Sequence, residues 1–325
     1  MKRTLLMLWF LVIAVFATYP VSLYAADSSY PNRSISVVVP FAPGGMTDLA
    51  ARLLSEFLEK ELKQPVVVSN RAGGSQTIGG YAVAQAKPDG YTLLFSPPVA
   101  YHPEAFSYFF EAPYTSKDLV PISRLQLVPL MITTRIDAPY NDLKEFVEYA
   151  RKNPPVKYGT FGKSSLGYIG ISSIGRAEKL DLVEVPYAGD GELVPALLGG
   201  HVPVGGTTFP PIQASVEAKK LKILAIISEK RLPFYPSIPT TTELGYPPPP
   251  GSCNGLYGPK GLPDEIIKKL ADAVTKIIEM KDFQDRANKL NLLLDYQGPD
   301  AYAKLQATSN QIYSDFFKAE GLVKK

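Results

Sequence analysis

Residues 35–54 read ISVVVPFAPGGMTDLAARLL, and this stretch carries the signals that decide the fold. Its first five residues are rich in β-branched side chains, which is typical of a buried parallel strand. From residue 49 to residue 62, apolar side chains recur at three- and four-residue spacing, as on one face of a helix. Gly44 and Gly45 separate the two patterns, and Thr47 or Asp48 suits the N-cap or first turn. The stretch therefore predicts a strand, a tight glycine turn and a helix.

The same order of elements continues along the chain. Strands are expected at 65–69 and 91–95, with a glycine-rich loop at 70–77 and a short helix at 78–86 between them. This β-α-β-α-β order indicates a parallel sheet with helices on its faces. A second unit of similar design is expected from a strand at 156–160, a loop of small residues at 161–167 and a helix at 168–179.

The remaining pattern completes two α/β lobes, with 27–128 and 252–325 in the first and 129–251 in the second. An apolar strand or crossover is expected at 125–134, and a loop-rich segment at 233–263 returns the chain to the first lobe. Both carboxy-terminal helices, at 265–280 and 301–317, are expected to pack on the first lobe. The other predicted elements are helices at 143–152 and 193–198 and strands at 182–185, 202–205 and 221–227.

The first 26 residues are typical of a secretory signal peptide. Lys2 and Arg3 precede an apolar run, and Ala25 and Ala26 offer small residues for cleavage. An uncleaved anchor helix remains an alternative, although the apolar run is shorter than the roughly 20 residues that span a bilayer. The mature protein is expected to be periplasmic. Without Lys2 and Arg3, the formal charge of +3 falls to about +1.

Composition excludes several classes of function. A charge so near zero gives no basic surface for nucleic acid, and no nucleic-acid partner is expected. Cys253 is the only cysteine among 325 residues, so an intramolecular disulfide is impossible. With two histidines and no cluster of ligand residues, no metal site is expected. No cofactor is expected either.

Signatures of catalysis are missing from the sequence. Gly162-Lys163-Ser164 resembles the end of a P-loop, but Lys157 stands where that pattern needs its first glycine. Neither the G-x-S-x-G motif of α/β-hydrolases nor the G-x-G-x-x-G motif of dinucleotide sites occurs in the corresponding loops. The sequence therefore gives no catalytic residue.

The glycine turns can instead bind an anion. The first N–H groups of a helix lack partners within the helix, and the helix dipole adds partial positive charge there. Glycine lets a ligand approach the backbone closely. Two such corners, at 41–48 and 161–167, would suit a carboxylate held between two lobes. The alternative, that Gly44-Gly45 is only a tight turn, remains open at this point.

An ordered series of short motifs resembles the Bug family, the extracytoplasmic receptors of tripartite tricarboxylate transporters. The likeness runs from about Tyr30 to the carboxyl terminus. The motifs that carry it are PFAPGGMTD at 40–48, PVVV at 65–68, NRAGG at 70–74, IG at 78–79, PDGYTLL at 88–94, VPYAG at 185–189, LLGG at 197–200, LAI at 224–226, IPT at 238–240 and ELGYP at 243–247.

The resemblance implies a type II periplasmic-binding-protein fold, with two doubly wound α/β lobes and a ligand cleft between them. It also implies a carboxylate held largely by backbone amides and waters. The matching positions in the first lobe are Phe41, Ala42, Pro43, Gly44, Gly45, Thr47 and Asp48, with Gly74, Ser75 and Thr77 beside them. Those in the second lobe are Thr160, Gly162, Ser164, Ser165, Tyr187 and Gly189.

The expected function is capture of a small organic carboxylate, of the dicarboxylate, tricarboxylate, aromatic acid or amino acid class. A monomer would deliver it to the membrane permease subunits of a tripartite tricarboxylate transporter. The sequence departs from the family pattern at Ser164, Gly167, Tyr168 and Pro203, which bears on the ligand class. A sensory protein that docks on a kinase or chemoreceptor is an alternative, and an exported enzyme is a weaker one.

Overall fold

Two mixed β-sheets with helices packed against them make up the protein. The computed structural model describes residues 30–246, 250–319 and 321. The segment predicted to be a signal peptide lies outside these residues. Residues 33–325 form one compact unit, and both sheets belong to it.

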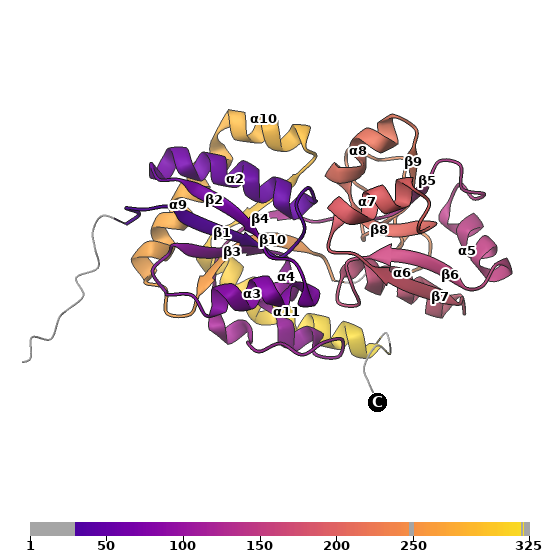
Figure 1. Cartoon of the computed structure of the whole chain (residues 1–325), viewed down its shortest axis with the longest axis horizontal. Coiled ribbons are helices and arrows are strands. Elements are labelled where there is room, and N and C mark those ends of the chain that lie inside the picture. The colour runs from indigo at the N-terminus through magenta and orange to yellow at the C-terminus, as the bar shows by residue number, and fades with distance from the viewer. Residues whose placement is uncertain (1–29, 247–249, 320, 322–325) are drawn as a thin grey trace, which may run out of the picture. The chain divides into compact units, whose positions relative to one another are not determined.

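Sheet A has six strands in the order β11-β4-β10-β3-β1-β2. Strand β1 pairs parallel with β2 and β3, whereas β10 pairs antiparallel with both β3 and β4. In Figure 1 its strands carry both early and late colours, because they come from both ends of the chain. The strands are β1 (Ile35–Val39), β2 (Val66–Asn70), β3 (Thr92–Ser96), β4 (Leu119–Leu127), β10 (Cys253–Pro259) and β11 (Leu293–Gln297).

Sheet B has five strands in the order β7-β6-β8-β5-β9, all from the middle of the chain. Strand β6 pairs parallel with β7 and β8, and β5 pairs antiparallel with β8 and β9. The chain passes from sheet A to sheet B between β4 and β5, and it returns between β9 and β10. The strands are β5 (Leu130–Arg135), β6 (Val156–Thr160), β7 (Leu182–Pro186), β8 (Val204–Thr208) and β9 (Leu221–Ile227).

Helices α2 (Met46–Leu62), α9 (Asp264–Glu279) and α11 (Pro299–Ala319) pack against strands of sheet A, as expected for the two carboxy-terminal helices. Helices α6 (Leu166–Ala177), α7 (Asp190–Leu198) and α8 (Phe209–Glu217) pack against sheet B. The other α-helices are α3 (Thr77–Ala84), α4 (Pro98–Tyr101), α5 (Leu143–Lys152) and α10 (Lys281–Lys289), and short 3₁₀ turns are η1 (Gly74–Gln76), η2 (Pro103–Phe106) and η3 (Ser116–Asp118).

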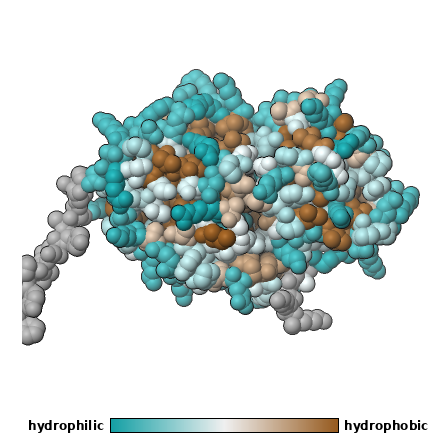
Figure 2. All heavy atoms as spheres, in the orientation of Figure 1, coloured by the Kyte–Doolittle hydropathy of each residue, from teal (hydrophilic) through white to brown (hydrophobic). Residues whose placement is uncertain are grey.

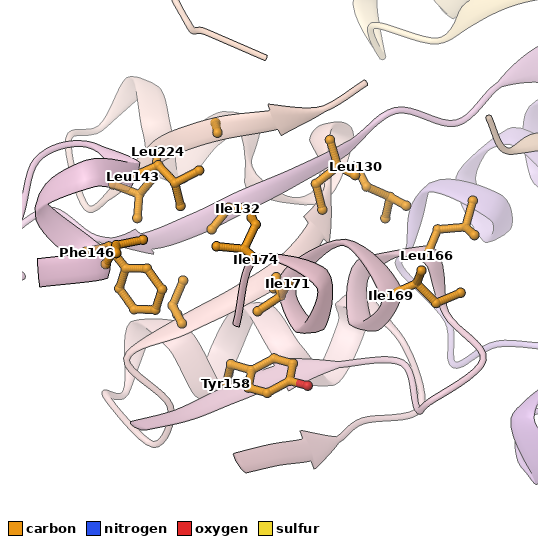
Figure 3. Packing of buried hydrophobic residues seen from close by; sticks show 14 of the residues in the cluster. Leu130, Ile132, Leu143, Phe146, Tyr158, Leu166, Ile169, Ile171, Ile174 and Leu224 are labelled. Carbon is orange, nitrogen blue, oxygen red and sulfur yellow. The ribbon is translucent and has the colours of Figure 1, made fainter. Parts of the chain in front are cut away.

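The apolar side chains of α6 explain its position. Its sequence alternates isoleucine with glycine and serine, so that one face is apolar and the backbone can approach the sheet closely. Figure 3 shows Ile171 and Ile174 of α6 beside Ile132 of β5 in one buried cluster. Tyr313 and Phe317 of α11 belong to the same cluster, so this helix also reaches residues of sheet B.

Several predicted elements differ from the observed ones. The segment at 125–134, expected to be a strand or a crossover, is the crossover: it contains the end of β4 and most of β5, which lie in different sheets. Strand β10 lies within the segment 233–263 that was expected to be loop-rich. Helices α6 and α7 begin at Leu166 and Asp190, two and three residues before their predicted starts. Strand β10 forms despite a weak local signal because it pairs with β3 on one side and β4 on the other.

The surface is mainly hydrophilic on the face that Figure 2 shows, and hydrophobic atoms there form separate groups. Among the described residues, none of the helices has the length and apolar character needed to cross a bilayer. Cys253 lies in β10 and is buried. It contacts the hydroxyl of Tyr302 at 4.0 Å.

Replacing Ile174 with alanine should destabilise the protein by about 2–5 kcal/mol, because it removes most of a side chain that is 1% exposed and leaves a cavity. Urea unfolding followed by circular dichroism measures the change. Ile312→Ala on α11 is the control, because Ile312 is 48% exposed and its loss should change stability little. Equal, small effects of both substitutions would contradict the packing described for α6.

Candidate functional site

The corner between β1 and α2 is held in shape by Asp48. Gly44 adopts φ +89°, which favours glycine, and its N–H donates to Asp48 Oδ2 at 2.9 Å. Arg52 Nε (2.9 Å) and Asn70 Nδ2 (2.8 Å) also donate to this carboxylate. Burial alone would raise the pKa of Asp48, but these hydrogen bonds outweigh it and hold the pKa below its usual value. Asp48 therefore stabilises the loop from within.

The corner between β6 and α6 has a similar construction. Gly162 adopts φ +93°, and the Ser165 side chain accepts a hydrogen bond from the Tyr168 N–H at 3.2 Å as N-cap of α6. The Ser165 N–H itself donates to Gly162 O at 2.9 Å. Thr160, the last residue of β6, stabilises the loop, since its hydroxyl accepts a hydrogen bond from the Gly162 N–H at 3.3 Å. The N–H groups of Leu166 and Gly167 have no partner within the helix.

Elements around the two sheets meet at these corners. The N–H of Ala42 donates to Ala188 O at 3.1 Å, which joins the loop before α2 to the loop before α7. The rings of Phe41 and Phe161 pack edge to face with centroids 6.0 Å apart. Gly191 lies so close to Pro43 that a Cβ at this position would be 2.2 Å from the Pro43 carbonyl oxygen. The two corners therefore face one shared space.

This space contains an inner cavity of about 50 Å³ and an outer hollow of about 270 Å³. Phe41, Gln76 and Phe161 line both, so the aromatic pair lies between them. The inner cavity is lined by Phe41, Gly45, Met46, Thr47, Gln76, Pro97, Val99, Val128, Leu130, Phe161, Ser165, Leu166, Gly189, Asp190, Thr208 and Ser252. The outer hollow adds Pro40, Gly73, Gly74, Ser75, Gly162, Pro186, Tyr187 and Ala188.

The residues predicted from the sequence fall into three groups around this space. Phe41, Gly45, Thr47, Ser165 and Gly189 line the inner cavity, and Gly74, Ser75, Gly162 and Tyr187 line the outer hollow. The rest lie in the supporting loops and first helical turns: Ala42, Pro43, Gly44, Asp48, Thr77, Thr160 and Ser164. Thr77 illustrates this role, because its hydroxyl donates to Gly74 O at 2.6 Å.

Asp190 is the main cavity residue that the sequence analysis missed. It is 4% exposed, and its carboxylate accepts hydrogen bonds from the Thr208 N–H (2.9 Å) and hydroxyl (2.6 Å). The N–H of Met46, in the first turn of α2, also donates to it. Burial raises the pKa of Asp190 to about 6, and the hydrogen bonds from Thr208 and Met46 offset part of that increase.

Unpaired polar atoms lie beside the cavity. The Oε1 atom of Gln76 and the Oγ atom of Ser164 are buried and have no hydrogen-bond partner. The Thr47 hydroxyl donates to Asn254 Oδ1 at 3.3 Å, whereas Asn254 Nδ2 is buried without a partner. Buried polar atoms without partners are uncommon in proteins, and Gln76, which lines both the cavity and the hollow, can offer its Oε1 atom to a ligand or a water molecule.

The electrostatics of the cavity come from dipoles and one carboxylate. None of the described residues that line it is a lysine, arginine or histidine, and Asp190 is the only acidic one. Within the described part of the chain, no group of three or more histidine, cysteine or acidic side chains could hold a metal ion. Two helix amino termini, capped by Gly45 and Ser165, supply the positive potential.

Comparison with known proteins identifies the family that shares this architecture. The family model described as "Tripartite tricarboxylate transporter family receptor" matches residues 50–322. The chain belongs to the Bug family of tripartite tricarboxylate transporter receptors. The protein BugT of Bordetella pertussis is 34% identical over 274 residues, which cover 83% of this chain and 84% of BugT.

Solved structures of this family share the fold. The periplasmic binding protein BugD has a TM-score of 0.83 at 30% identity, covering 91% of this chain and all of BugD. MatC from Rhodopseudomonas palustris, with bound malate, has a TM-score of 0.81 at 29% identity, covering 88% of this chain and 99% of MatC. The type II periplasmic-binding-protein fold expected from the sequence is confirmed. Bug proteins are solute-binding receptors, so the chain belongs to a family defined by binding and not by catalysis.

Replacing Asp190 with asparagine should change how stability depends on pH. Burial raises the pKa of Asp190 from 3.8, the ordinary value of an aspartate, to about 6, so the folded protein loses stability as pH rises between these values. Asparagine cannot ionise. The wild type should therefore lose roughly 3 kcal/mol of stability relative to the variant between pH 4 and pH 7.

Chemical denaturation of both proteins from pH 4 to pH 8 measures this difference. Only the difference between wild type and variant is informative, since other groups titrate equally in both. A difference that stays constant across the range would mean that the Asp190 carboxyl does not titrate near pH 6.

Proposed function

We propose that the protein is a periplasmic receptor that captures a small organic carboxylate. Two helix amino termini, one from each side of the cleft, line a single cavity and carry this proposal. Amides in the first turns of α2 and α6 can hold an acid group without a basic side chain. The malate bound to MatC supports an organic acid as the kind of ligand.

The ligand-binding residues form two layers in this proposal. The inner one contacts the ligand through Gly45, Thr47, Ser165 and Gly189, and the outer one through Gly74, Ser75, Gly162 and Tyr187. Phe41 contributes to both. Hydrogen bonds of Ala42, Gly44, Asp48, Thr77 and Thr160 hold the surrounding loops in position, and Pro43 and Ser164 are part of those loops.

Two lobes close on the ligand in this proposal. The first comprises residues 27–128 and 252–325, and the second residues 129–251. The passages between sheets, after β4 and after β9, agree with these boundaries. In this proposal the receptor is a monomer that is exported with a signal peptide. It delivers the acid to the membrane subunits of a tripartite tricarboxylate transporter, and membership of the receptor family supports this role.

A panel of small acids should reveal the ligand class through thermal stabilisation. An acid present at 100 times its dissociation constant should stabilise the fold by about 2.7 kcal/mol, because it binds the folded protein alone. Differential scanning fluorimetry identifies the binders, and mass spectrometry of the protein as purified identifies any acid carried with it. If no organic acid of any class stabilises the protein, it is not a carboxylate receptor.

Gly191→Ala should weaken binding of every such acid by about tenfold or more. The new Cβ would lie 2.2 Å from the Pro43 carbonyl, so α7 could no longer approach the loop before α2. In this proposal the lobes of the unliganded protein separate and relieve that contact, and alanine suits a helix better than glycine does, so the unliganded variant should keep its melting temperature.

Gly251→Ala is the matched control, since a Cβ there meets no atom within 4 Å. Isothermal titration calorimetry compares the two variants with the wild type. Unchanged affinity in Gly191→Ala would mean that the contact between Pro43 and Gly191 is not part of the ligand-bound protein.

A further inference from the structure

Asp190 is the only ionisable side chain among the described residues that line the inner cavity. It begins α7, on the side of sheet B, and its carboxylate accepts hydrogen bonds from Thr208 on the same side. It also accepts from the Met46 N–H of α2, on the side of sheet A. The carboxylate therefore lies between the two sides of the cleft.

This position restricts where a ligand's acid group can bind. The Met46 N–H belongs to the amino terminus of α2, and Asp190 already uses it. A second carboxylate at that point would lie beside a buried negative charge, and no described lining residue is a cation that could compensate. Of the other first-turn amides, those of Thr47 in α2 and Leu166 in α6 belong to residues that line the cavity, and they remain for the acid group.

The cavity also has spare acceptor capacity. The Asp190 carboxylate already accepts from the Thr208 N–H and hydroxyl and from the N–H groups of Met46 and of Asp190 itself. These four donors use the roughly four acceptor positions of a carboxylate, so Asp190 offers the ligand its negative charge. Gln76 lines the same cavity, and its buried Oε1 atom has no partner. An ammonium or hydroxyl group on the ligand would satisfy the Gln76 oxygen and lie beside the Asp190 carboxylate, whereas a methylene group would leave that oxygen unpaired.

We propose that Asp190 selects acids that carry a hydrogen-bond donor next to the carboxylate, so that amino and hydroxy acids are preferred over their unsubstituted counterparts. This inference rests on the proposed function, since it assumes that the cavity binds an organic acid. It adds the chemical class of the ligand and the residue that discriminates.

Matched acids test the selection, since the members of each set differ only in the substituent at one carbon. The sets are succinate, malate and aspartate; glutarate, 2-hydroxyglutarate and glutamate; and propionate, lactate and alanine. Titration calorimetry at pH 8 keeps Asp190 ionised, because its pKa is about 6. In the set that fits the cavity, the amino or hydroxy acid should bind the wild type about tenfold or more tightly than the plain acid.

Asp190→Asn should reduce this preference to within about threefold, mainly by weakening the amino acid and strengthening the plain acid. The control is Glu192→Gln, which removes a negative charge from the same first turn of α7. Glu192 is exposed and accepts from the Ala188 N–H at 3.0 Å, and it does not line the cavity. This control should keep the wild-type preference.

The outcomes separate this inference from the proposed function. If plain acids bind the wild type as tightly as amino and hydroxy acids, Asp190 is not the selector, although the protein remains a carboxylate receptor. A preference that survives in Asp190→Asn also overturns the inference. Simple amines without an acid group complete the panel. If they bind and acids do not, or if nothing binds, the proposed function itself fails.

Discussion

The first turn of an α-helix leaves main-chain N–H groups without partners in the helix, and the cleft of this protein is built around two such turns. One begins α2 and the other begins α6, and each follows a parallel strand through a loop with a glycine at positive φ. The rest of the architecture serves to bring these turns together. After the last strand of sheet B, the chain returns to sheet A as strand β10, which lies between β3 and β4. The chain therefore crosses between the sheets twice.

The main-chain amide dipoles of these turns keep a fixed position at the cavity, which flexible charged side chains could not do as well. Asp48 fixes the loop before α2 through Gly44, Arg52 and Asn70, and it does so without lining the cavity. An amide has a fixed direction, whereas a lysine would lose side-chain entropy to reach the same point. The cavity is thereby left nearly free of formal charge, and a single carboxylate, that of Asp190, dominates its electrostatics.

Local sequence signals predicted the parts of the fold that depend on short-range patterns. The β-branched run of β1, the apolar face of α2 and the two loops of small residues were all identified. Strand β10 was missed because its sequence, CNGLYGP, contains two glycines and a proline. It is a strand because it pairs with neighbours on both sides. Asp190 was missed because its burial depends on Thr208 and Met46, which are distant in sequence.

Cys253 gives the protein a practical property. Its thiol is buried in β10 beside Tyr302, and burial raises its pKa to about 11. Alkylating reagents attack the thiolate, so a shielded thiol that stays protonated at neutral pH reacts slowly. Cysteines introduced on the surface of each lobe can therefore carry spin labels or fluorophores without removal of the native one. The opening and closing of the cleft can be followed in an otherwise unaltered chain.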